Sequence, residues 1–106
     1  MNNHKEILEM IEYPKKGVLS KEIFRTDNIN FTLFCMASGT EMSEHTSTKK
    51  GFVYVVEGEG DFNLQGKSIK MKEGVFINIE ENAVHSLKAN ENISFILSLY
   101  NMSKEP

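Results

Sequence analysis

Short strand-like segments recur from Val18 to Tyr100, about one every 8–12 residues, with turn signals between them. Most are rich in β-branched or aromatic residues, and several alternate apolar with polar side chains, as strands do. No stretch has the apolar periodicity of a long helix, so a βαβ fold is excluded. The pattern predicts an all-β sandwich or barrel, and periodicity alone does not separate an immunoglobulin-like sandwich from a jelly roll. The expected strands cover residues 18–24, 29–36, 52–56, 61–65, 68–71, 75–79, 84–89 and 93–100.

The chain has 106 residues, which fits one domain and leaves no room for two. A short N-terminal helical turn is expected over residues 5–11, and Pro14 then ends it. We predict a single domain over residues 1–106, with an N-terminal arm (1–17), a β-barrel (18–100) and a polar tail (101–106) that frays.

The segment Phe52–Val56 is an unbroken run of aromatic and β-branched residues, which is typical of a strand buried on both faces. If His45 faces the barrel interior and the pleat is regular, Val53 and Val55 face the interior as well. The side chains between and after them, Tyr54 and Val56, would then face outward.

Charge and cysteine content exclude several classes of partner and compartment. The formal net charge is −3 and lysines occur only in pairs, so neither nucleic acid nor an anionic membrane surface is an expected partner. A single cysteine, Cys35, cannot form an intrachain disulfide, which suits a reducing compartment. The N-terminus has no signal-peptide core and no apolar run approaches the roughly 20 residues of a membrane span, so we expect a cytoplasmic protein.

Two segments resemble the signature motifs of the cupin superfamily. The first runs Gly39-Thr-Glu-Met-Ser-Glu-His45 and continues to Tyr54-Val-Val-Glu-Gly-Glu-Gly60; the second runs Gly74-Val-Phe-Ile-Asn-Ile79 and continues to His85. The likeness covers about residues 18–100 and identifies the chain as similar to small single-domain cupins. It implies an all-β fold of the double-stranded β-helix, or jelly-roll barrel, type. It also implies that His45 and His85 share a pocket and are its metal ligands.

The chain departs from the cupin motifs where the family's other two metal ligands stand. Ser47 occupies the position of the second histidine, and the glutamate position falls on Gly51. In the second motif, Glu80, Asn82 and Ala89 replace the proline, glycine and asparagine. Because a divalent metal prefers at least three good ligands, two imidazoles would hold Zn, Mn, Fe or Ni only weakly.

A substitute third ligand would have to come from a nearby carboxylate or thiol. Glu41 stands four residues before His45, so in a regular strand the two side chains share a face, whereas Glu44 points the opposite way. Cys35 depends on a strand register that the sequence does not fix. With Ser47, Val53 and Val55, Glu41 completes the expected pocket.

Three functions fit these residues. The first is a cupin with a degenerate metal site, binding a divalent transition metal, a small molecule or both. The second is a non-catalytic, metal-free small-molecule sensor, in which the histidines donate and accept hydrogen bonds. The third, ranked last, is a metal-free sugar-nucleotide epimerase, which needs a histidine–aspartate base and an opposing tyrosine; Tyr54, Asp61 and Tyr100 are the available candidates. The sequence does not decide whether the chain is an enzyme.

A homodimer is the expected assembly. Small cupins are commonly dimers, often with exchanged N-terminal strands, and a two-fold dimer is the commonest symmetric assembly. Residues 18–24 are the candidate for such an exchange.

Overall fold

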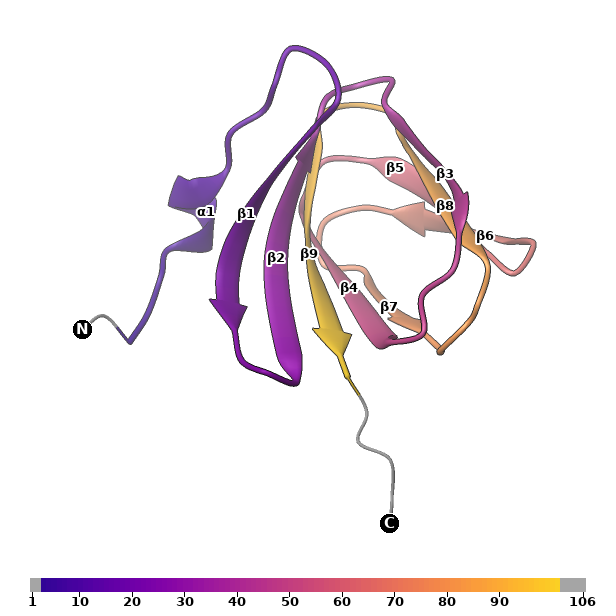
Figure 1. Cartoon of the computed structure of the whole chain (residues 1–106). Coiled ribbons are helices and arrows are strands. Elements are labelled where there is room, and N and C mark those ends of the chain that lie inside the picture. The colour runs from indigo at the N-terminus through magenta and orange to yellow at the C-terminus, as the bar shows by residue number, and fades with distance from the viewer. Residues whose placement is uncertain (1–2, 102–106) are drawn as a thin grey trace.

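In the computed structural model, which describes residues 3–101, nine strands form two antiparallel sheets that face each other, and one short helix precedes the first strand (Figure 1). The five-stranded large sheet has the order β1-β2-β9-β4-β7, and the four-stranded small sheet has the order β3-β8-β5-β6. The all-β prediction and the jelly-roll arrangement are confirmed. The elements are α1 (Ile7–Met10), β1 (Val18–Arg25), β2 (Ile29–Met36), β3 (Glu41–His45), β4 (Lys50–Glu57), β5 (Gly60–Leu64), β6 (Lys67–Met71), β7 (Phe76–Ile79), β8 (His85–Ala89) and β9 (Ile93–Tyr100).

The core fills the space between the inner faces of the two sheets. Val53 and Val55 of β4 point into it from the large sheet, and Phe62 and Leu87 meet them from the small sheet. Tyr54 lies between the two valines and is exposed on the outer face of the large sheet. The alternation expected for residues 52–56 is therefore present, whereas the expected burial on both faces is not, because only the inner face of this strand is covered by the opposite sheet and Tyr54 on the outer face is exposed.

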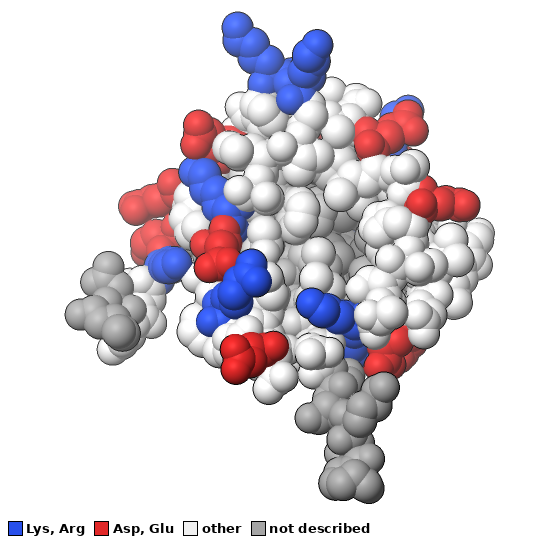
Figure 2. Space-filling view, viewed as in Figure 1, with Lys and Arg blue, Asp and Glu red and all other residues white. Residues whose placement is uncertain are grey.

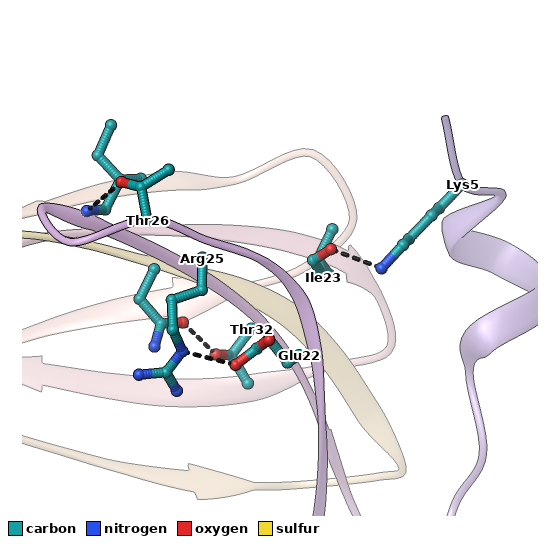
Figure 3. Close-up of polar contacts among 8 residues, drawn as sticks. Lys5, Glu22, Ile23, Arg25, Thr26 and Thr32 are labelled. Atoms are coloured by element: carbon teal, nitrogen blue, oxygen red, sulfur yellow. Dashed lines mark hydrogen bonds and ion pairs between the residues drawn. The ribbon is translucent and has the colours of Figure 1, made fainter. Parts of the chain in front are cut away.

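The N-terminal arm packs against the outer face of the large sheet. Tyr13 donates a hydrogen bond of 2.7 Å from its hydroxyl to the Glu57 carboxylate. Burial, together with this carboxylate, raises the pKa of Tyr13 to about 12. Lys5 donates from Nζ to the backbone oxygen of Ile23 at 2.6 Å, which ties the start of the arm to β1 (Figure 3). Cys35, on the outer face of β2, is completely buried.

Most of the strands were predicted from the sequence, but one was missed. Residues 29–36 and 93–100 are strands with the expected bounds, and the helical turn is confirmed over Ile7–Met10. The strand Glu41–His45 was not predicted, because its side chains are mostly polar and exposed. Of the expected tail, residues 102–106 lie outside the described residues. Residues 3–101 include no helix long and apolar enough to cross a membrane.

Candidate functional site

His45 and His85 stand directly opposite each other on neighbouring strands of the small sheet. Their Cα atoms are register partners in the antiparallel pair β3–β8. The two imidazole rings meet edge to face, with centroids 4.2 Å apart and planes inclined by 64°. Strand pairing thus brings together two rings that are forty residues apart in the sequence.

Both rings are held in one tautomer by the backbone. Nδ1 of His45 lies 2.8 Å from the carbonyl oxygen of Ser43, and Nδ1 of His85 lies 2.9 Å from that of Ala83. Because a carbonyl oxygen only accepts, each Nδ1 carries the proton of the neutral ring. Nε2 of each histidine is left with a lone pair, which can accept a hydrogen bond or bind a metal.

His85 is the buried member of the pair. The residue is 8% exposed, and its ring lies parallel to that of Phe62 with centroids 5.8 Å apart. Burial lowers the pKa of His85, and the nearby His45 lowers it further, although the hydrogen bond to Ala83 opposes both effects. His85 is therefore neutral at pH 7, with its Nε2 unprotonated.

The two rings separate a small inner cavity from a larger outer one. The inner cavity, of about 40 Å³, is lined chiefly by apolar side chains, and the outer one has a volume of about 160 Å³. Figure 2, which looks toward the space between the sheets, shows mostly uncharged side chains in the middle and charged ones around them. The outer cavity is lined by His45, Ser47, Lys49, Gly51, Ile79, His85, Leu97 and Leu99.

The expected pocket residues fall into three groups. Ser47 lines the outer cavity, together with Gly51, so both positions that lost a metal ligand still border the site. Val53 lines the inner cavity. Val55 is completely buried in the core and lines neither cavity.

The expectation that Glu41 shares a face with His45 is wrong. The pairing of β3 with β8 shifts register between Met42 and His45. Met42 pairs with Leu87 and His45 with His85, so three steps along β3 lie opposite only two steps along β8. This bulge places Met42 and His45 together in the inner cavity and leaves Glu41 on the opposite face. Regular alternation fails at a bulge because one extra residue reverses the faces of all that follow.

The other substitute ligands also lie away from the histidines. Glu44 lines the same outer surface of the small sheet as Glu41. Cys35 lies behind the large sheet, under the N-terminal arm. Asp61 borders the outer surface of the small sheet, and Tyr54 and Tyr100 project from the outer face of the large sheet, so the epimerase arrangement is not formed.

These positions test whether a complete transition-metal site is present. Within residues 3–101, no three side chains of histidine, cysteine, aspartate or glutamate lie close enough to hold one ion. The site offers two imidazole nitrogens, one fewer than a stably held divalent transition metal usually requires. The residues present therefore do not form the full ligand set of a resident metal.

Comparison with known proteins agrees with this architecture. The family model described as "Cupin domain" matches residues 32–99, which is more than half of the chain. The chain belongs to the cupin family. A cupin superfamily protein from Desulfitobacterium hafniense has a similar structure, with a TM-score of 0.87, 16% identity and coverage of 96% of this chain and 94% of that one.

Two further relatives share nearly the whole cupin domain. A Streptococcus pyogenes protein of unknown function matches with a TM-score of 0.87 and 17% identity, over 98% of this chain and 91% of its own. An uncharacterized protein of Aquifex aeolicus is 25% identical over 101 residues, covering 93% of this chain and 84% of the relative. At these identities the structural likenesses show the cupin fold alone.

Sequence reasoning missed several residues that shape the cupin cavity. Ile79, Leu97 and Leu99 form much of its apolar wall, and Lys49 also lines it. Phe62 supports the ring of His85. The period-2 alternation of β7 and β9 marks Ile79 and Leu97 as inward-facing, but only the spatial register shows that they meet the histidines.

Mild acid is expected to destabilise the cupin through His85. Since the pKa of His85 is lowered in the folded state, the unfolded chain binds more protons as pH falls below about 6.5. Stability should therefore fall from pH 6.5 downward and level off below the folded pKa of His85.

Midpoints of urea unfolding at pH 7.5 and 5.5 measure this loss of stability, with His85→Phe as the control. Glu80, whose pKa the Lys50 ammonium lowers, titrates below this window. If the stability of the His85→Phe variant falls with pH as steeply as that of wild type, the loss does not come from His85.

Proposed function

We propose that this cupin binds a small, largely apolar molecule in its barrel cavity, through hydrogen bonds to the histidine pair. The observation that carries the proposal is the common tautomer of the two rings, because it leaves Nε2 of both His45 and His85 as acceptors. Such a site suits a ligand with an apolar body and an O–H or N–H donor. Apolar pockets with a few well-placed polar groups are the usual form of small-molecule sites.

The outer end of the cavity adds polar groups of a different kind. Ser47 and Lys49 border the cavity there, and the Ser47 hydroxyl accepts a hydrogen bond of 3.1 Å from the backbone N–H of Lys49, whereas Ile79, Leu97 and Leu99 contribute apolar wall. A ligand can therefore place its donor at the imidazoles and an acceptor near the rim. This division of roles defines orientation in the cavity and favours a molecule with polar groups at two separated points.

A matched pair of probes tests the hydrogen-bond acceptors. Phenol and toluene share one aromatic ring, but only phenol has an O–H donor. We expect phenol to bind at least about threefold more tightly than toluene, because an accepted hydrogen bond contributes about 1 kcal/mol. Titrations followed by backbone amide shifts in NMR spectra measure both affinities in the same protein.

The control for this experiment keeps the rings and removes the acceptors. In the double variant His45→Phe/His85→Phe the preference for phenol should disappear while weak binding of toluene remains. If wild-type protein binds the two probes equally, or if the variant keeps the preference, the proposal is wrong.

Weak binding of a divalent transition metal is a second candidate function for the same atoms. The two rings are 4.2 Å apart between centroids, and each Nε2 has a free lone pair. With two protein nitrogens and water as ligands, we expect Ni²⁺ or Zn²⁺ to bind with a dissociation constant well above the nanomolar range. Binding should weaken below about pH 6, since a protonated imidazole cannot ligate.

Calorimetry on metal-stripped protein without a histidine tag checks the metal affinity. Substituting either His45 or His85 with alanine should abolish the binding, whereas Glu41→Ala should leave it unchanged because Glu41 lies on the opposite face of β3. Stoichiometric nanomolar binding would show that a third ligand exists and would contradict this reading.

A further inference from the structure

A tight turn in the connection from β7 to β8 precedes His85 and has an unusual backbone conformation. The backbone N–H of Ala83 donates a hydrogen bond of 3.2 Å to the carbonyl oxygen of Glu80, which closes the turn. Asn82, the third residue of the turn, has a φ of +66°. Type II turns require a positive φ at this place, which glycine adopts freely and asparagine tolerates. The path of the chain into β8 therefore depends on Asn82.

The residue that follows Asn82 fixes the tautomer of His85. Ala83 is 3% exposed and packs in the core between the sheets. Its carbonyl oxygen lies 2.9 Å from Nδ1 of His85. Because Asn82 directs the chain from an exposed turn into the core, its backbone conformation decides where this carbonyl points. The acceptor at Nε2 of His85 thus depends on a residue three positions earlier in the chain.

The same residue also holds the connection from β3 to β4. The backbone N–H of Asn82 donates a hydrogen bond of 2.7 Å to the carbonyl oxygen of Ser47. Ser47 lines the outer cavity, and its hydroxyl accepts a hydrogen bond from the backbone N–H of Lys49, which lines the cavity too. The contact with Asn82 therefore places this polar part of the cavity wall relative to His85.

Contacts on either side of Asn82 hold the two ends of the connection. Before it, the Glu80 carboxylate lies 2.9 Å from the ammonium of Lys50, the first residue of β4. After it, the carbonyl oxygen of Val84 accepts a hydrogen bond of 2.8 Å from the backbone N–H of Gln65, in the turn between β5 and β6. Because both ends are tied to other strands, a change of φ at Asn82 has to be absorbed within the turn, where the two contacts with the site lie.

We propose that Asn82 is a positioning residue of the histidine site, which sets the tautomer of His85 and the place of Ser47 through its left-handed backbone conformation. One residue then joins the acceptor inside the cavity to the polar part of its wall. A ligand that reaches both groups meets them at a fixed separation, so the turn contributes to specificity. This role rests on the proposed function only where it concerns ligands, since the state of the ring can be measured without one.

Two substitutions of Asn82 test the importance of its backbone conformation. Asn82→Gly keeps a positive φ readily, so ¹⁵N NMR spectra at pH 7.5 should still show the His85 proton on Nδ1. Asn82→Val opposes this conformation, because a β-branched side chain strongly disfavours a positive φ. We expect the ratio of Nδ1-protonated to Nε2-protonated His85 to fall at least about fivefold in Asn82→Val, the effect of losing one ordinary hydrogen bond. The preference for phenol over toluene should fall with it, by at least about twofold.

Gly39→Val is the matched control for general loss of stability. Gly39 also has a positive φ, of +87°, and an added Cβ there would meet nothing within 4 Å. Its backbone N–H donates to the carbonyl oxygen of Ala89, at the end of β8 opposite His85. The substitution therefore strains a turn away from the histidines. It should lower the midpoint of urea unfolding and leave the His85 tautomer unchanged.

The ring spectra decide between a positioning role and a merely structural one. A wild-type tautomer in Asn82→Val, or an equal change of tautomer in Asn82→Gly or Gly39→Val, would overturn the proposal. If Asn82→Val does not fold, Asn82→Ala takes its place, because alanine disfavours the same φ less strongly. If wild-type protein shows no preference for phenol, the proposed function fails, and the same spectra still decide the role of Asn82.

Discussion

The Phe62→Ala variant is expected to lose about 3–5 kcal/mol of folding free energy, the usual cost of removing a large buried aromatic side chain. Phe62 is 1% exposed and packs between the sheets, so truncation leaves a cavity at the centre of the barrel. A loss of this size is a large share of the roughly 5–15 kcal/mol that stabilises a typical domain. Chemical denaturation with urea, monitored by circular dichroism, measures it.

The same substitution should disturb the candidate site, because Phe62 stacks on the ring of His85. Without that support, the His85 ring should gain rotational freedom and the preference for phenol over toluene should shrink. Phe62→Leu is the control: it keeps most of the volume and should cost less than about 1.5 kcal/mol. Equal stability losses in the two variants would contradict the packing described for this position.

The Gly58→Ala variant is expected to be at least about 3 kcal/mol less stable than wild type, from a strained backbone and a steric clash together. Gly58 has a φ of +94°, where side chains are disfavoured. An added Cβ would overlap the backbone oxygen of Asn92 and lie 2.6 Å from the Cα of Ile93. Since the neighbouring atoms are backbone, they cannot move aside without opening the start of β9.

Gly66→Ala separates the two contributions. Gly66 also has a positive φ, of +83°, but an added Cβ would meet nothing within 4 Å. Its substitution should cost only the backbone strain, about 1–2 kcal/mol. Thermal unfolding of both variants compares the two losses of stability. A loss for Gly58→Ala no greater than that for Gly66→Ala would contradict the close approach of the Gly58 turn to the backbone of Asn92 and Ile93.

Much of the fold follows directly from local pattern. The segment Ile29–Met36 and the final strand Ile93–Tyr100 have strong β-branched and aromatic composition, so their bounds were predicted correctly. The burial of Val53 and Val55 followed from simple alternation. These features depend only on neighbours in sequence, which is why one sequence suffices to predict them.

Features that depend on pairing between distant strands were harder to predict. The bulge in β3 places Glu41 and His45 on opposite faces of the strand, and no residue between them is a sequence signal for a bulge. Contacts between aromatic rings on the outer face of the large sheet, such as that of Phe31 with Tyr100, were missed for the same reason: these rings are far apart in the sequence and meet only through the pairing of the strands. The facing of His45 and His85 was anticipated from the motif resemblance, whereas their shared tautomer required the backbone geometry.

One measurement tests the central claim most directly: a long-range ¹H–¹⁵N NMR spectrum of the imidazole rings at pH 7.5, combined with nuclear Overhauser effects between them. The account predicts that His45 and His85 both carry their proton on Nδ1 and show cross-peaks between their ring protons. Nε2-protonated rings, or rings without any mutual Overhauser effect, would mean that the two acceptors do not share the cavity, and would contradict the account.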